Sequence, residues 1–223
     1  KHGSLGDLIQ ANGAMEDIKK SNLTSHVVLL TSVPYFDLMN QCPYIDEVLV
    51  DKREPRWNLF YLYKLKKKLS SFNFVRIFDL QNSSRTEFYR NHLLRKSEWS
   101  STVTALEPGQ KKSDFDKEPV LERMEIQLKK SRIKTINVKK SNLNWAVVNI
   151  RNITKNYFNR KYILIFPFCS PKLKNKKWPY FHILISQLKS KYHNKYDIVL
   201  APGPNEIEEA KLLNACTVLD EGK

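Results

Sequence analysis

The chain has 223 residues, of which 41% are hydrophobic and 27% charged, and its 38 Lys and Arg against 23 Asp and Glu give a formal net charge of +15. This apolar share excludes a disordered, collagenous or coiled-coil chain, and the length fits one or two domains of about 100–200 residues. No apolar run approaches the ~18 residues that a membrane-spanning helix needs, since the longest ones, at 27–30 and 162–168, have the length of strands.

The first third of the chain alternates between helical and extended patterns. Apolar residues with helical spacing predict a helix over residues 7–20, and two leucine- and valine-rich runs at 26–31 and 46–50 predict strands. A second helix with a basic outer face is predicted over 57–69, and a third strand over 74–80. Strands that alternate with helices in this way are typical of parallel α/β layers.

The middle of the chain continues this alternation and then weakens it. Helices are predicted near residues 85–94 and over 118–130, where Pro119 stands in the first turn, a position that accepts proline. A polar, basic stretch follows, and then a further helix pattern over 144–158. The linker between two halves of the chain is therefore expected within residues 135–160.

The last third restarts the pattern of the first. Strands are predicted at residues 161–168, 197–200 and 217–219. Amphipathic helices over 178–191 and 206–214 connect them. This order again favours a parallel sheet covered by helices.

The predicted architecture is two doubly wound α/β domains, the first over residues 1–150 and the second over 151–223. The chain begins at Lys1 without a methionine, and it ends just after the apolar run at 217–219. We therefore expect both ends to be incomplete, with the first strand of the first domain and part of the second domain missing.

The positive charge is concentrated in one segment. Residues 126–196 contain 17 Lys and Arg and no acidic residue, so this segment carries +17 while the rest of the chain carries −2. A charge this one-sided favours anionic partners such as phosphate, nucleic acid or anionic lipid. The alternative interpretation is a lysine- and asparagine-rich composition whose side chains are simply solvated.

The three cysteines, Cys42, Cys169 and Cys216, lie far apart and form no Cys-x-x-Cys pair. Their spacing and odd number indicate neither a disulfide framework nor a zinc site. The expected location is a reducing, cytoplasmic compartment.

A glycine-containing stretch, residues 1–7 (KHGSLGD), directly precedes the first predicted helix. Gly3 and Gly6 permit a tight turn, and the main-chain N–H groups at a helix start favour an anion or a polar ligand. The pattern is not the dinucleotide-binding GxGxxG, which needs another spacing and a preceding strand. Asp7 suits the first turn of a helix, so the spacing by itself favours a capping role.

Two further loops join predicted strands to helices in the second half. Residues 168–179 (FCSPKLKNKKWP) contain four lysines, and ligands of open α/β sheets bind at the carboxyl ends of strands. A diphosphate site and a solvated basic loop anchored by Trp178 are both compatible with this pattern. In the turn 201–206 (APGPNE), Glu206 can either bind a sugar hydroxyl pair or favour the helix start.

Five motifs follow one another along the chain: GSLGD at 3–7, PYIDEVLVDKR at 43–53, DLQNSSRT at 79–86, KKWP at 176–179 and APGPNE at 201–206. Their order and spacing resemble the ADP-heptose:lipopolysaccharide heptosyltransferase family over nearly the whole chain. The resemblance implies a GT-B fold, in which the first Rossmann-like domain binds the acceptor and the second binds the nucleotide-sugar.

The resemblance also implies roles for residues of the first domain. Asp7 matches the aspartate proposed in the family as the base that deprotonates the acceptor hydroxyl, which suits an inverting displacement at the anomeric carbon. Arg85 matches a basic residue on the acceptor side, and Ser4 and Gly6 are assigned to acceptor binding with it. The implied acceptor is an anionic glycolipid, the lipopolysaccharide core or a related surface glycan, reached by a cytoplasmic enzyme with peripheral contact to the inner membrane.

For the second domain the resemblance implies a donor site. Lys176 matches a lysine that contacts the leaving diphosphate, and Ser170 lies close to a small hydroxyl residue of the same loop. Glu206 matches a glutamate associated with the ribose. The expected donor is ADP-heptose or a similar nucleotide-sugar. No cofactor and no metal are expected, because cationic side chains and helix N-termini can hold the charge of the diphosphate.

This sequence departs from the family in two places. The family's downstream Asp-(Ser/Thr)-Gly-Pro-x-His motif, which wraps the diphosphate-sugar, does not occur before Lys223, and Asn12-Gly13-Ala14 replaces Leu-Pro-Ala in the first helix. The first departure puts the activity of these residues by themselves in doubt, and the second concerns packing more than chemistry.

Other function classes stay open on the residues themselves. The basic segment fits a nucleic-acid-binding α/β protein, although the aromatic residues near it follow core positions and no nucleic-acid motif occurs. The missing GxGxxG, and the missing acid at the end of the next strand, disfavour a dinucleotide-dependent enzyme. The charge also fits loose docking on an anionic membrane surface, although no segment forms a dedicated amphipathic anchor.

Overall fold

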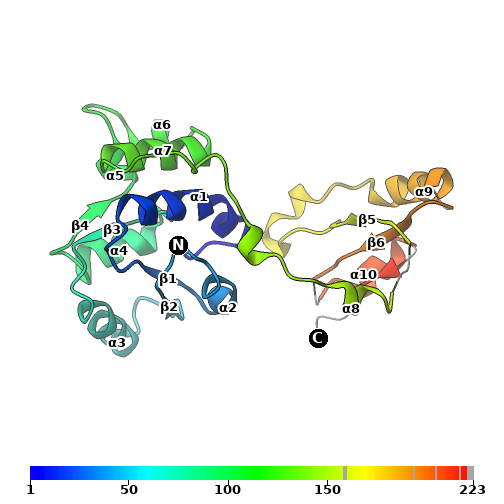
Figure 1. Ribbon diagram of the computed structural model, residues 1–223, viewed down its shortest axis with the longest axis horizontal. Helices are drawn as coiled ribbons and strands as arrows, with labels where there is room; N and C mark the ends of the chain where they lie inside the picture. The colour runs from blue at the N-terminus through cyan, green and yellow to red at the C-terminus, as the bar shows by residue number, and fades with distance from the viewer. Residues whose placement is uncertain (158–159, 193, 204, 216, 220–223) are drawn as a thin grey trace. The chain divides into compact units, whose positions relative to one another are not determined.

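A computed structural model describes residues 1–157, 160–192, 194–203, 205–215 and 217–219 (Figure 1). The chain divides into two compact units, unit 1 (Lys1–Val147) and unit 2 (Val148–Lys223), and each is described by itself. Within the described ranges, no helix has both the length and the apolar character that crossing a membrane requires. Phe158 of the predicted 144–158 helix, Pro204 of the 201–206 turn and Cys216 lie outside these ranges.

Unit 1 contains two pairs of parallel strands. Strand β1 (Val28–Ser32) pairs with β2 (Glu47–Asp51), with Val28 opposite Glu47. Strand β3 (Arg76–Phe78) pairs with β4 (Glu98–Ser100), which the sequence patterns did not predict. Three residues are too few for an alternating pattern to show, and β4 has one exposed, one half-buried and one buried residue.

Several helices of unit 1 begin at capping residues. Ser4 caps the first helix, and the side chain of Asn58 accepts a hydrogen bond from Tyr61 N at the start of the third. These helices are α1 (Leu5–Ser21), α2 (Phe36–Met39), α3 (Leu59–Ser70), α4 (Ser84–His92), α5 (Thr102–Ala105), α6 (Lys112–Phe115) and α7 (Val120–Lys130). A 3₁₀ turn, η1 (Val33–Tyr35), precedes α2.

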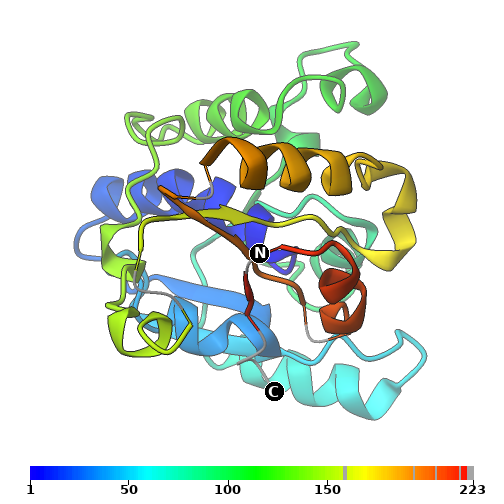
Figure 2. The same cartoon turned by 90° about the vertical axis from the view of Figure 1, so that its right-hand side faces the viewer.

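Alternate residues of β1 enter two different cores. Leu29 belongs to a cluster formed with α1 and α7, which includes Leu8 and Leu128. Its neighbours Val28 and Leu30 pack instead against a second cluster, formed mainly by α3 and α4. The period of two in a strand therefore distributes β1 between two helical layers. Figures 1 and 2 show α1 and α7 on one side of β1 and β2, and α3 on the other.

Helix α1 also holds the segment that follows α7. The carboxylate of Asp17, which is buried, accepts hydrogen bonds from three successive main-chain N–H groups, those of residues 136–138, at 2.9–3.0 Å. Asn12 donates to Asn142 O at 2.9 Å, and a Cβ at Gly13 would overlap the carbonyl of Asn137. The Asn-Gly pair in the first helix therefore serves this close packing.

Unit 2 contains a three-stranded parallel sheet in the order β5 (Tyr162–Ile165), β6 (Asp197–Leu200) and β7 (Thr217–Val218). Helices α9 (Phe181–Tyr192) and α10 (Ile207–Leu212) lie on opposite sides of β5 and β6 in Figures 1 and 2. The core is the buried cluster Ile165, Ile185, Ile198, Leu200 and Ala210.

The segment at the boundary of the two units and one connection of unit 2 differ from the sequence patterns. The predicted 144–158 helix is replaced by a 3₁₀ turn, η2 (Asn144–Ala146), and one short helix, α8 (Arg151–Thr154), because the β-branched residues between them favour extended backbone. The predicted 178–191 helix begins at Phe181, after the 3₁₀ segment η3 (Pro171–Lys176) and a turn at Pro179.

A cavity of about 620 Å³ lies between the two strand pairs of unit 1. Its lining includes residues 27–30 on the β1 side and 74–80 on the β3 side. Lys1 lies at one end of it, where its main-chain nitrogen donates to Leu30 O at 2.9 Å and Nζ donates to Leu80 O at 2.9 Å. Because neighbouring strands lie about 4.8 Å apart, one further extended segment in this space could pair with both β1 and β3.

Candidate functional site

The turn before α1 is built around Asp7. Oδ2 of Asp7 accepts hydrogen bonds from the main-chain N–H of Ser4 at 2.7 Å and from its hydroxyl at 3.0 Å. A Cβ at Gly3 would overlap the Asp7 carboxylate, whereas a Cβ at Gly6 would come no closer than 3.8 Å to its nearest neighbour. Asp7 is therefore the capping carboxylate that its position in the helix predicts, and both of these bonds end on one of its two oxygens.

A buried polar cluster lies beside this turn and is centred on Asp51, the last residue of β2. Its members, which we call the Asp51 cluster, are His2, Asp51, Tyr61, Arg85 and Tyr89. The hydroxyls of Tyr61 and Tyr89 both donate to the Asp51 carboxylate, the latter at 2.7 Å. His2 Nε2 lies 3.1 Å from Asp51 Oδ2, and both side chains are almost completely buried.

The Asp51 cluster favours one set of protonation states. Burial raises the pKa of Asp51, but the groups that face its carboxylate, His2, Tyr61 and Tyr89, outweigh this and hold the pKa well below its usual value. Burial lowers the pKa of His2, so its ring is neutral at pH 7. Burial and the adjacent carboxylate together raise the pKa of Tyr61, which keeps its hydroxyl protonated. Asp51 is thus a fixed negative charge surrounded by donors.

His2 connects the carboxyl ends of three strands. Its main-chain N–H donates to Gln81 Oε1 at 3.0 Å, after β3. Its carbonyl accepts from Ser32 Oγ at 3.0 Å, at the end of β1, and its ring faces Asp51 at the end of β2. The carboxyl ends of parallel strands are where ligands of α/β folds bind, so this edge of unit 1 is the candidate site.

Arg85 is held in the same cluster. One guanidinium nitrogen donates to Tyr89 Oη at 3.1 Å, and the other donates to the carbonyls of Arg53 and Glu54 at 3.3 and 3.0 Å. The side chain is half-buried. Three of the residues predicted for the acceptor side, Ser4, Gly6 and Asp7, share one turn. Arg85 is connected to that turn only indirectly. It bonds to Tyr89, Tyr89 bonds to Asp51, and Asp51 faces the His2 ring.

The sequence patterns missed His2, Asp51, Tyr61 and Tyr89. Tyr61 and Tyr89 stand at core-facing positions of helices, where an aromatic residue needs no functional explanation. Asp51 ends an apolar run, where an acid looks like the first exposed residue of a loop. The sequence feature that could have indicated this cluster is His2, which stands next to the glycine turn that also contains Asp7.

In unit 2 the predicted donor loop follows β5. Ser170 is exposed, and its carbonyl accepts from Leu173 N at 2.8 Å. Lys176 ends η3 with an exposed side chain, for which the described residues offer no ionic partner. Lys177 differs, because it pairs with Glu209 of α10 and lies 4.9 Å above the Phe168 ring. Trp178 packs edge-to-face on Tyr180 and Phe181, so the loop also has the aromatic anchor that its alternative interpretation requires.

The turn after β6 lies next to this loop, because Ala201 N donates to Ile165 O at 3.1 Å. Oε2 of Glu206 accepts from Gly203 N at 2.8 Å, and the residue is half-buried at the start of α10. Glu206 therefore stabilises its own turn. The structure brings the two predicted donor loops to the carboxyl ends of two adjacent parallel strands.

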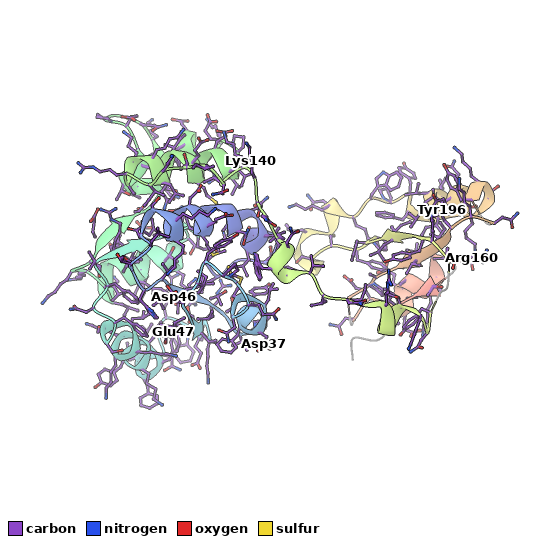
Figure 3. All side chains as sticks on the ribbon, viewed as in Figure 1. Asp37, Asp46, Glu47, Lys140, Arg160 and Tyr196 are labelled. Carbon is purple, nitrogen blue, oxygen red and sulfur yellow. The ribbon has the colours of Figure 1, made fainter. Side chains whose placement is uncertain are left out.

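The amino ends of the strands carry ion pairs instead. Asp46 pairs with Lys19 at 2.6 Å and accepts from Val27 N, and Asp197 pairs with Arg160 at 3.2 Å. Figure 3 labels Asp46 and Arg160 at these ends. Their charges are satisfied by structural partners, which leaves the carboxyl ends as the place for a site. In the described part of the chain, no three His, Cys, Asp or Glu residues are grouped as metal ligands would be.

Comparisons with known proteins identify the fold. No family model matches the chain, and neither does any curated protein. A glycosyl transferase family 9 protein from Veillonella parvula matches with a TM-score of 0.69 and 15% identity, over 96% of this chain and 64% of that one. The E. coli heptosyltransferase WaaC with ADP-2-deoxy-2-fluoro heptose matches with a TM-score of 0.65 and 17% identity, over 98% and 74%. E. coli ADP-heptose lps heptosyltransferase II gives 0.62 and 16%, over 95% and 66%.

The chain therefore has the α/β fold of GT-B glycosyltransferases, as the motifs predicted. Within that class, the structures that it resembles are heptosyltransferases and a family 9 glycosyl transferase. The chain spans 64% of the length of the Veillonella protein.

Replacing Gly3 tests how tightly the turn encloses Asp7. We expect Gly3→Ala to destabilise unit 1 by about 1–3 kcal/mol, because the new methyl group displaces the carboxylate from Ser4. Gly6→Ala is the matched control, since its methyl group makes only an ordinary contact with Ser4 and alanine favours a helix. Thermal melts of both variants measure the difference, and equal stability would contradict the described packing of this turn.

Proposed function

We propose that the chain is part of an inverting, metal-independent glycosyltransferase that moves a heptose-like sugar from a nucleoside diphosphate to a lipopolysaccharide core or a related surface glycan. The observation that carries this proposal is the Asp7 carboxylate, oriented at the carboxyl ends of the strands in a chain with the fold of heptosyltransferases. The residues 1–150 then bind the acceptor, and 151–223 bind the nucleotide-sugar. Structures of WaaC with ADP and with an ADP-sugar support the class of donor.

In this proposal Asp7 is the general base. Ser4 holds Oδ2, which leaves Oδ1 to take the proton of the acceptor hydroxyl. As that proton moves to the carboxylate, the hydroxyl oxygen forms a bond to the anomeric carbon. The bond from that carbon to the diphosphate breaks on the opposite face, and its electron pair leaves with the diphosphate.

In this proposal the loop after β5 binds the leaving diphosphate and stabilises its negative charge. Lys176 is the exposed cation there, and Ser170 offers a hydroxyl. Fixed positive charge at a developing phosphate anion lowers the barrier without a metal. Glu206, held by Gly203, has its other carboxylate oxygen available to accept from a ribose hydroxyl. On the acceptor side Arg85 adds positive charge for an anionic glycolipid.

Asp7→Asn tests the base directly. The amide oxygen can still accept from Ser4, so the turn should stay folded, but the amide cannot take a proton. We expect transfer by the natural full-length protein to fall about 10²–10⁴-fold, with ADP affinity unchanged. The measurement is transfer from ADP-heptose to a lipopolysaccharide acceptor. Asp46→Asn, at the opposite ends of the strands, should keep its activity, whereas normal turnover by Asp7→Asn would exclude Asp7 as the base.

Lys176→Ala tests the diphosphate contact. A lost charge-assisted hydrogen bond costs about 1.5–3 kcal/mol, so we expect ADP to bind about 10–100-fold more weakly by calorimetry. Lys177→Ala is the matched control, because Lys177 is already paired with Glu209 and should affect ADP binding much less. Unchanged ADP affinity in Lys176→Ala would remove this residue from the proposed site.

The second candidate, nucleic-acid binding, has support only from the basic segment 126–196. Several of its cations pair with acids from outside that segment, among them Lys130 with Glu107 and Lys139 with Glu122. Phe168 and Phe181 pack against the core of unit 2 and are not free to stack on bases. A mobility-shift assay at physiological salt distinguishes the candidates, since strong salt-dependent retention is expected only of a nucleic-acid-binding protein.

A further inference from the structure

The guanidinium of Arg85 is held from two directions, and both lead back to Asp51. On one side Nη1 donates to Tyr89 Oη at 3.1 Å, and Tyr89 in turn donates to Asp51 Oδ2 at 2.7 Å. On the other side Nη2 donates to the carbonyls of Arg53 and Glu54, in the loop that follows β2. One buried carboxylate therefore lies behind both supports of Arg85.

The support from the loop includes a residue in a rare backbone conformation. Arg53 has a φ of 56°, in the left-handed region that a residue with a Cβ seldom adopts. Its main-chain N–H donates to Asp51 Oδ1 at 2.8 Å, and this bond helps to offset the cost of the conformation. Asp51 thus helps to fix the peptide groups whose carbonyls hold Arg85.

These contacts leave part of the guanidinium for a ligand. The side chain of Arg85 is half-buried, and the bonds to Tyr89, Arg53 and Glu54 do not use all the N–H donors of a guanidinium. A planar cation held in one orientation recognises a carboxylate or a phosphate by direction as well as by charge. It also loses less rotamer freedom on binding than a mobile side chain does.

We propose that Tyr89 and Asp51 are positioning residues, which fix the orientation of Arg85 and thereby raise the affinity for an anionic acceptor. This role rests on the proposed function, because Arg85 is taken there as the residue that meets the acceptor. The alternative is that the hydroxyls around Asp51 serve only the stability of unit 1. Tyr61 separates the two roles.

Tyr61 and Tyr89 form a matched pair. Both are buried and both hydroxyls donate to Asp51, but among the described contacts it is Tyr89 that also accepts from Arg85. Tyr61→Phe and Tyr89→Phe should therefore lower the melting temperature by similar amounts. The positioning role predicts that acceptor affinity falls mainly in Tyr89→Phe.

The probe is O-deacylated lipopolysaccharide without heptose, titrated by calorimetry into the natural full-length protein. We expect Tyr89→Phe to weaken its binding about tenfold and Tyr61→Phe to weaken it much less, with ADP affinity unchanged in both. In an Arg85→Gln background, Tyr89→Phe should have little further effect, because the group that it positions is gone.

Arg85→Lys gives a second test that leaves the buried tyrosines in place. Lysine keeps the charge, but its single ammonium lacks the planar fork that meets Tyr89 and the two carbonyls together. We expect this variant to fold normally and to lose about as much acceptor affinity as Tyr89→Phe. Full affinity in Arg85→Lys would show that charge without orientation is sufficient, and would overturn the positioning role.

Three other results would also overturn this role while leaving the proposed function standing. They are equal losses of acceptor affinity in Tyr61→Phe and Tyr89→Phe, additive losses in the Tyr89→Phe and Arg85→Gln double variant, and unchanged affinity in Arg85→Gln. If the protein without substitutions neither binds the probe nor transfers sugar to it, the proposed function is wrong and the positioning role falls with it.

Discussion

A carboxylate at the end of β2 determines how the candidate site is assembled. An ion removed from water must be matched by donors, because an unpaired buried charge costs several kcal/mol. Asp51 meets this demand with the hydroxyls of Tyr61 and Tyr89 and with the main-chain N–H of Arg53. Since these donors come from α3, α4 and the loop after β2, the same requirement fixes the positions of three elements around one edge of unit 1.

The turn that carries Asp7 depends on this arrangement through His2. Its ring faces Asp51, and its main-chain groups bond to residues that follow β1 and β3. The turn is therefore held by two strand ends and a buried charge. Such support from surrounding groups is what keeps a polar side chain within the narrow geometry that proton transfer needs.

Much of the fold could be predicted, because hydrophobic period and capping residues are local signals. The predicted 7–20 helix is observed as Leu5–Ser21 and the 118–130 helix as Val120–Lys130, with Pro119 just before it. The three-residue strand β4 and the separation of the strands into two pairs could not be predicted, since pairing depends on residues distant in the sequence. The surroundings of the basic segment 126–196 could not be predicted either. The segment contains no acidic residue, but in the folded unit some of its lysines pair with acids from elsewhere in the chain, such as Lys130 with Glu107.

The candidate site was predictable only where local motifs mark it. The glycine turn and the strand–helix loops marked the places, but the family resemblance was needed to single out Asp7, Lys176 and Glu206 within them, and their roles stay predictions. The Asp51 cluster was invisible, because burial of a polar side chain results from contacts between elements and leaves no periodic pattern. Lys176 and Lys177 are neighbours of the same residue type, and the structure distinguishes them by the ion pair of Lys177 with Glu209 and by its place above the Phe168 ring.

Helix α1 has a mechanical consequence beyond its role in packing. Its first turn holds Asp7, and its middle holds residues 136–138 through the Asp17 carboxylate and the close approach at Gly13. A helix of 17 residues is a stiff rod about 25 Å long. Residues 136–138, in the last part of unit 1, and the proposed base are thus attached to one rigid helix, so a force applied to residues 136–138 reaches Asp7 without any intervening loop to absorb it.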